Sequence, residues 1–259
     1  MSERPFRRVL LTNDDGIAAP GLAILERIAA GLADEVWVVA PEHDQSGTGQ
    51  SISLHSPLRV FKHDTRRFAV SGTPADCVMF AMAEWLQDTP PDVVLSGVNC
   101  GTNVGDSVPY SGTVGAVLST DLLGLPAIAL SQAFFERDKV DWSPAETFAA
   151  PMIRRLWQQR QGTGCCWNVN FPACNARDIT QLRMVRESRG SIQRPRLLAG
   201  EDARGLPYWW LGFERSSKHI VAPEADISAL RDNRIAITAL RETQGWLALG
   251  EEQSVADLT

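Results

Sequence analysis

The chain has 259 residues, of which 44% are hydrophobic and 22% are charged, and this balance excludes an intrinsically disordered protein. Its formal net charge of -6 at pH 7 argues against a nucleic-acid duplex as a partner, because a duplex needs a broad basic face to neutralise its phosphates. The first apolar stretch ends at residues 13–15, so we expect no signal peptide, and no apolar run is long enough to cross a membrane.

The first half alternates short apolar runs with helical patterns, which is typical of a parallel sheet with crossover helices. A good helix start is Thr73-Pro74-Ala75-Asp76, with a Thr cap, a Pro at the next position and an acid in the first turn. In chain order we expect a strand over 8–12, a helix from 20, strands over 36–40, 58–61 and 68–71, a helix over 73–86, a strand over 92–96, a helix over 113–123 and a strand over 127–130.

The second half is less regular. We expect a helix over 144–159, followed by strands over 165–171, 182–186, 208–211 and 235–240. The region 190–207 is rich in Arg, Pro and Gly, which indicates a protruding loop or arm. We expect Trp209 and Trp210 in the core or at an interface. Since no linker separates two units, we predict one α/β domain over 1–259, with a core over about 1–185 and a C-terminal part over about 186–259.

The five cysteines form no CxxC pair and leave one unpaired. This pattern favours reduced thiols over a disulfide framework or a zinc site. We therefore predict a cytoplasmic protein.

Three polar loops each follow an expected strand. In a doubly wound sheet, loops that follow neighbouring strands meet at one crevice beyond the carboxyl ends of the strands. We therefore expect these loops to converge. They cover residues 13–16, 42–50 and 99–113.

The convergent loops offer oxygen ligands for a cation. Asp14 and Asp15 supply carboxylates, Gly16 permits a turn that brings them to one point, and Ser46 and Asn99 add neutral oxygens. Such a set suits one Mg²⁺ or Mn²⁺ ion, with room for water and a substrate phosphate. A zinc site is disfavoured because no His/Cys cluster lies nearby.

The third loop also suits an anion. Ser111, Gly112 and Thr113 precede a helix, so their hydroxyls and backbone N–H groups can face phosphate oxygens, assisted by the helix dipole. The familiar phosphate motifs GxxxxGK[ST] and, after the first strand, GxGxxG are absent.

Each segment alone has a simpler interpretation. Residues 13–16 can form a turn that caps a helix, Asn99 can brace a turn through the backbone, and residues 111–113 can be a helix cap. The functional interpretation depends on the co-occurrence of all three loops in order.

Together these residues resemble the SurE (survival protein E) nucleotidases. The resemblance covers most of the first half and continues more weakly at Arg189-Gly190 and over 207–212. The matching segments are LLTNDDG at 10–16 with APG at 19–21, AP at 40–41 with QSG at 45–47, SGTPADCV at 71–78, PD at 91–92 with SGVNCG at 96–101, NVGD at 103–106 and YSGTV at 110–114.

The resemblance implies a Rossmann-like, mostly parallel sheet flanked by helices, with a smaller β-rich C-terminal extension. It implies a divalent-metal hydrolase of nucleoside 5′- and 3′-monophosphates, sometimes also of short polyphosphate. It implies a homodimer or homotetramer formed partly by exchanged C-terminal elements. The family's metal ligands fall on Asp14, Asp15, Ser46 and Asn99, and its phosphate loop falls on residues 111–113.

We hypothesise metal-assisted hydrolysis of a nucleotide monoester, with Asp14, Asp15 and Asn99 as catalytic residues and Asn13 orienting the ligands. An aspartate nucleophile is less favoured, because the Asp-x-Asp spacing of aspartyl-phosphate enzymes is absent. Two alternatives are a non-catalytic metal-dependent nucleotide sensor and a phosphatase for a non-nucleotide monoester. The sequence leaves open the preferred base, the 5′ or 3′ preference, the native metal, the oligomer size and the role of residues 190–207.

Overall fold

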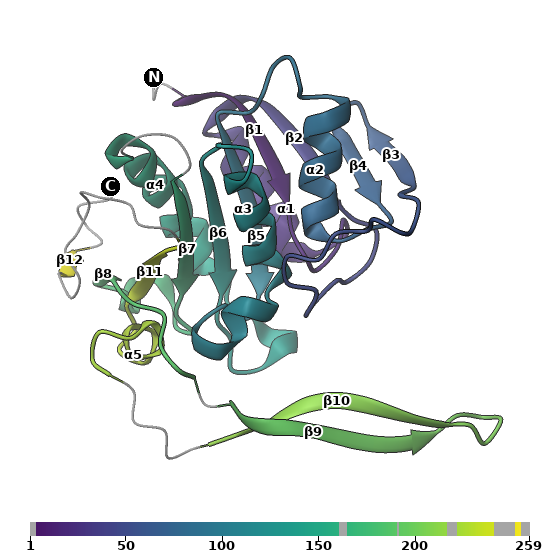
Figure 1. The fold of residues 1–259 in the computed structure, drawn as a ribbon. Coiled ribbons are helices and arrows are strands. Elements are labelled where there is room, and N and C mark those ends of the chain that lie inside the picture. The colour runs from purple at the N-terminus through teal and green to yellow at the C-terminus, as the bar shows by residue number, and fades with distance from the viewer. Residues whose placement is uncertain (1–3, 161–164, 191, 217–221, 241–251, 255–259) are drawn as a thin grey trace.

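The computed structural model describes residues 4–160, 165–190, 192–216, 222–240 and 252–254 (Figure 1). These residues form a central sheet with the strand order β12-β8-β11-β7-β6-β5-β1-β2-β4-β3 and a separate pair, β9 and β10. The strands are β1 (Phe6–Thr12), β2 (Ala33–Pro41), β3 (Val60–Asp64), β4 (Arg67–Val70), β5 (Val93–Cys100), β6 (Ala127–Gln132), β7 (Cys166–Phe171), β8 (Gln181–Met184), β9 (Ile192–Glu201), β10 (Pro207–Arg215), β11 (Ile235–Ala239) and β12 (Glu252–Ser254). The α-helices are α1 (Pro20–Ala30), α2 (Pro74–Glu84), α3 (Gly112–Asp121), α4 (Ser143–Gln159) and α5 (Asp226–Arg231).

The middle of the central sheet is parallel. Strands β4, β2, β1, β5, β6 and β7 pair in parallel with their neighbours, whereas β3, β11 and β12 introduce antiparallel pairs towards the edges. From β1 the chain builds β2 and β4 on one side and then returns to place β5 on the other side. The topological switch point therefore lies between β1 and β5, where open α/β sheets bind their ligands.

Helices cover both faces of this sheet (Figure 1). Along β1, Val9 and Leu11 pack with α1 and α4, whereas Leu10 points to the opposite face and packs with α2 and α3. Side chains of a strand alternate between faces, so a run that is apolar throughout is what a doubly covered strand requires. The predicted α/β, Rossmann-like fold with a smaller C-terminal β extension is confirmed.

The predicted start of α2 is confirmed. The Thr73 side chain accepts from the backbone N–H of Asp76 at 3.1 Å, and the Asp76 carboxylate accepts from the N–H of Thr73 at 2.9 Å. This reciprocal pair is a capping box, which satisfies two N–H groups that a helix start otherwise leaves unpaired.

The predicted extent of β5 was wrong. The strand runs on to Cys100 after a register irregularity between Ser96 and Asn99, so that Asn99 pairs with Ser131 of β6. Asn99 therefore lies on a strand end, and the loop that follows it contains a 3-10 helix, η1 (Gly105–Tyr110), that we did not predict. The prediction ended at Ser96 because the apolar run ends there in the sequence. Backbone pairing with β6 continues the strand to Cys100.

Strands β9 and β10 form a long antiparallel hairpin that projects from the body of the protein (Figure 1). Region 190–207 is thus an arm as predicted, but it is a strand and turn rather than an irregular loop. Trp209 and Trp210 are 58% and 68% exposed, so the core part of their prediction was wrong, and the interface part stays a prediction. In the part of the chain that is described, no helix has the length and apolarity needed to cross a bilayer.

Candidate active site

The two predicted carboxylates stand at the switch point. β1 ends at Thr12, and the chain then turns through Gly16, whose φ of 99° is open to glycine and strained for other residues. The Asn13 amide donates to the carbonyl of Gly16 at 2.9 Å and holds this turn. Asn13 is fully buried, and its Oδ1 atom has no hydrogen-bond partner. The turn presents Asp14 and Asp15 towards different neighbours.

Asp14 faces the start of α3. One of its carboxylate oxygens accepts from the Thr113 hydroxyl at 2.7 Å, and the other accepts from the Thr113 backbone N–H at 3.1 Å. A Cβ atom on Gly112 would come within 2.8 Å of the Asp14 Cβ, so glycine is needed for this close approach. The first loop and the third loop are therefore in direct contact.

Asp15 faces β5 and the loop that follows β6. Its Oδ2 accepts from the backbone N–H of Cys100 at 2.9 Å, and its Oδ1 lies 3.8 Å from a guanidinium nitrogen of Arg137. The Asp15 side chain is only 9% exposed, whereas that of Arg137 is 60% exposed. One aspartate thus contacts each side of the crevice between β1 and β5.

The electrostatics of this pair favour a cation. Burial, the largest cause, and the neighbouring charge of Asp15 together raise the pKa of Asp14 to about 6, against the lowering effect of the hydrogen bonds from Thr113. Burial likewise raises the pKa of Asp15. Two adjacent carboxylates in a covered site repel each other, and a hard divalent ion would relieve both the repulsion and the burial penalty. The oxygen donors present here therefore fit Mg²⁺ or Mn²⁺.

The loop after β2 also reaches Asp14. The backbone N–H of Gln45 donates to the carbonyl of Asp14 at 2.7 Å, which places Ser46 next to the first loop. Ser46 is exposed, and its backbone N–H donates to the Asp44 carboxylate at 2.7 Å. Gln45, which precedes the predicted ligand Ser46, thus makes the contact between the loop after β2 and the loop after β1.

Asn99 is 9% exposed at the end of β5, one residue before the N–H group that binds Asp15. Its amide donates to the carbonyl of Gly101 at 3.0 Å, so it does brace a turn. This bond uses only the nitrogen of the side chain, and bracing is therefore compatible with an oxygen ligand.

The predicted phosphate loop is also a helix cap. The Ser111 hydroxyl accepts from the N–H of Val114 at 3.1 Å, and Ser111 is the N-cap residue of α3. Gly112 and Thr113 form the first turn, and it is this turn that touches Asp14. The N-terminal end of α3, which carries partial positive charge, is therefore directed towards the carboxylate pair.

Residues from the second half hold the glycine-rich loop, and sequence reasoning missed them. The Asp226 carboxylate accepts from the N–H of Gly105 at 2.7 Å. Asn168 and Asn170 of β7 both donate to the carbonyl of Asn103, at 2.7 and 3.1 Å. These positions are 65 to 121 residues apart in the chain. For β7 the available signal was the pair of alternating asparagines in an otherwise apolar strand.

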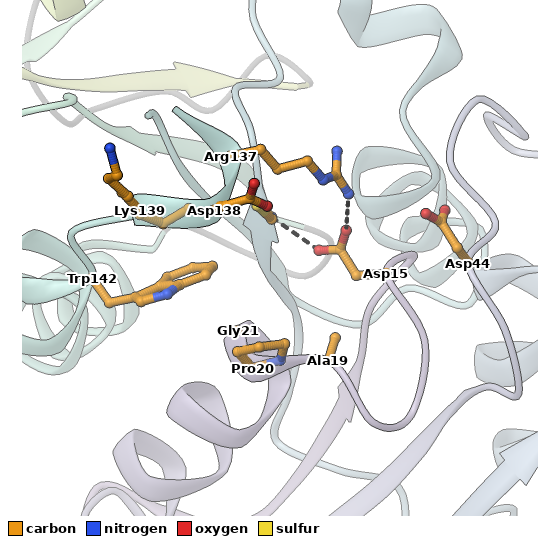
Figure 2. Close-up of a pocket in the computed structure, with 11 residues that line it drawn as sticks. Asp15, Ala19, Pro20, Gly21, Asp44, Arg137, Asp138, Lys139 and Trp142 are labelled. Atoms are coloured by element: carbon orange, nitrogen blue, oxygen red, sulfur yellow. Dashed lines mark hydrogen bonds and ion pairs between the residues drawn. The ribbon is translucent and has the colours of Figure 1, made fainter. Parts of the chain in front are cut away.

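A cleft of about 400 Å³ opens beside Asp15 (Figure 2). The loop between β6 and α4 supplies one side, including Arg137 and Trp142, and the start of α1 supplies another. This loop is not one of the three that the sequence predicted to converge at the crevice. The signal was topological: β6 is parallel to β5 and ends at the same edge of the sheet.

The chain is similar to proteins of one known family. Residues 9–194 match the family described as Survival protein SurE. The 5′-nucleotidase SurE 1 of Burkholderia lata is 48% identical over 236 residues, which cover 91% of both chains. The 5′-nucleotidase SurE of Brucella anthropi is 47% identical over 236 residues, or 90% of both chains. The crystal structure of the SurE protein from Aquifex aeolicus superposes with a TM-score of 0.74 and 30% identity, covering 90% of this chain and 92% of that one. The chain therefore belongs to the SurE family.

Proposed function

We propose that this protein is a divalent-metal-dependent 5′-nucleotidase that hydrolyses nucleoside monophosphates to nucleoside and phosphate. The observation that carries the proposal is the contact of three separate segments with the turn that presents the two adjacent carboxylates. Asp14 binds the loop after β2 through its carbonyl and the start of α3 through its carboxylate, and Asp15 binds the end of β5. The names of the curated relatives support the same activity.

In this proposal Asp14, Asp15, Ser46 and Asn99 hold one divalent cation per subunit, Mg²⁺ or Mn²⁺. The bound cation supplies positive charge that polarises the phosphoryl oxygens and favours attack by water. The supporting observation is chemical. Asp14 is buried, the side chain of Asp15 is largely covered, and the exposed Arg137 guanidinium lies 3.8 Å from Asp15. The other donors are neutral oxygens.

The start of α3 then holds the substrate phosphate. The Ser111 hydroxyl and the Gly112 backbone N–H, with the positive end of the helix dipole, offset charge on the phosphoryl oxygens. Thr113, the third residue of this loop, donates its hydroxyl and its N–H to Asp14 and so joins the phosphate loop to the metal ligands. Asn13 keeps the two aspartates in position through its bond to Gly16.

A phosphate-release assay tests the activity. Purified protein is incubated with AMP, GMP, CMP and UMP, with 3′-monophosphates and with short polyphosphate, each with Mg²⁺, Mn²⁺ or EDTA. We expect metal-dependent release from the 5′-monophosphates and loss of at least 100-fold in kcat/KM in Asp14→Asn. Nucleotide binding without release would favour a sensor, and release only from non-nucleotide monoesters would favour a different phosphatase.

We also propose a homodimer or homotetramer assembled through the β9–β10 hairpin. Leu198 pairs with Trp210 across the hairpin, and these side chains are 59% and 68% exposed. A projecting ribbon with large exposed apolar side chains is typical of an interaction surface. Light scattering after size exclusion should show a dimer or tetramer that dissociates in the double variant Leu198→Asp/Trp210→Asp; a monomeric wild type would contradict this. A cytoplasmic location fits the five free thiols.

A further inference from the structure

The cleft beside Asp15 has two chemically different walls (Figure 2). One wall is apolar and is formed by the start of α1 and the end of the loop after β6. The other wall is polar and contains the charged side chains, including the Asp15 carboxylate. Its volume of about 400 Å³ falls within the usual range for small-ligand sites, about 300–1,000 Å³. Ala19, Pro20, Gly21 and Trp142 lie on the apolar wall, and Arg137, Asp138 and Lys139 lie on the polar wall with Asp15 and Asp44 (Figure 2).

Trp142 is held in a fixed position on the apolar wall. It is half-buried, packs against the core formed with α1 and α4, and immediately precedes α4. The first turn of α1 lies directly against it, because a Cβ on Gly21 would be 3.1 Å from Cη2 of the indole and 1.9 Å from the carbonyl of Val98. Glycine therefore allows α1 to approach β5 and the indole closely, and the packed indole forms part of the wall.

The charges of the cleft disfavour a second anion. Asp15, Asp44 and Asp138 carry three negative charges against the two positive charges of Arg137 and Lys139. A neutral, flat group with hydrogen-bonding edges matches a site with one aromatic wall and one polar wall. A nucleoside has this chemistry, since its base is planar and its ribose carries hydroxyls.

We propose that this cleft binds the base and ribose of the substrate, with the Trp142 indole as the surface on which the base rests. The inference rests on the proposed function, which places the cation on both aspartates and the substrate phosphate at the start of α3, where Thr113 contacts Asp14. Because Asp15 directly follows Asp14 and lines the cleft, a nucleotide bound there can extend its nucleoside along the wall. The contact between Trp142 and the base then gives the enzyme its preference for nucleotides over small phosphate monoesters.

The test measures nucleoside binding without chemistry. Adenosine is titrated into wild type and Trp142→Leu with Mg²⁺ present, and saturation-transfer NMR reports the affinity and the protons in contact. We expect saturation of the base protons in wild type and about tenfold weaker binding in Trp142→Leu, because the variant loses the stacking of the base on the aromatic ring. Trp142→Phe, which keeps an aromatic face, should retain most of the affinity. Trp37→Leu is the matched control, because Trp37 is another half-buried indole and stacks on Phe68 away from the cleft.

Kinetics separate a nucleoside site from a general structural role. Trp142→Leu should raise KM for AMP about tenfold with kcat within about twofold, and leave kcat/KM for ribose 5-phosphate unchanged. Equal losses for AMP and ribose 5-phosphate, or no loss of adenosine binding, would overturn the proposal. If wild type binds adenosine through Trp142 but cleaves no nucleotide, the cleft stands and the proposed hydrolase activity fails.

Discussion

Replacing Asp14 by Asn should stabilise the metal-free protein while it abolishes activity. Asp14 is 4% exposed, and burial raises its pKa from an ordinary 3.8 to about 6. The folded protein therefore holds this proton more tightly than the unfolded chain does, so stability falls as the pH rises from about 4 to about 6, and the penalty is complete above about pH 7. An amide carries no such penalty.

The expected gain follows from these pKa values. Raising the pKa from 3.8 to about 6 corresponds to about 3 kcal/mol lost by the ionised folded state. The asparagine can accept only one of the two hydrogen bonds from Thr113, which costs about 1 kcal/mol. The net gain at pH 8 is therefore about 2 kcal/mol, or about 4–8 °C in melting temperature for a chain of this size.

Thermal melts in EDTA at pH 8 and pH 4 measure this gain. We expect Asp14→Asn to melt higher than wild type at pH 8 and not at pH 4, and Asp88→Asn, at an exposed position, to match wild type at both. Saturating Mn²⁺ should stabilise wild type and leave Asp14→Asn unchanged. A variant that is less stable than wild type at pH 8 would refute the view that the buried, ionised Asp14 carboxylate destabilises the metal-free protein.

Three further variants test neighbouring contacts. Thr113→Val removes a hydrogen bond that lowers the pKa of Asp14, so the acidic limb of the pH–activity profile should move to higher pH; an unmoved limb counts against this pair. Glu35→Gln breaks the 2.7 Å ion pair with Arg8, which lowers the pKa of Glu35 to about 2. The ion pair between Arg8 and Glu35 stabilises the folded protein above about pH 4.5, and this stabilisation is lost towards pH 2. In urea unfolding, the free energy of unfolding of Glu35→Gln should therefore be about 1 kcal/mol below that of wild type at pH 7 and equal to it near pH 2. Asp226→Ala frees the glycine-rich loop, so kcat should fall about tenfold in a protein destabilised by about 1–3 kcal/mol; unchanged kcat would mean that the loop needs no anchor.

Local chemistry made much of the fold predictable. The capping box at Thr73 and Asp76 is visible in four consecutive residues, and the apolar run before Asp14 identifies a covered strand. The fold class was predictable, because alternating strands and helices almost always form a parallel sheet. The position of Asp14 and Asp15 at the carboxyl edge followed from that class.

Features that depend on distant pairing were not predictable in the same way. β5 continues to Cys100 because Asn99 pairs with Ser131, 32 positions along the chain. Arg137 joins the crevice through Asp15, which is 122 positions away. The hairpin shows the same limit for burial, since the Trp210 side chain is large and apolar but 68% exposed. Hydrophobicity alone does not distinguish a side chain of the core from an exposed apolar side chain on the hairpin.

Anomalous diffraction from crystals soaked in Mn²⁺ tests the central claim most directly. We predict one manganese peak per subunit between β1 and β5, coordinated by side-chain oxygens of Asp14, Asp15, Ser46 and Asn99. A peak elsewhere, or one that leaves both aspartates uncoordinated, would contradict the proposed metal site.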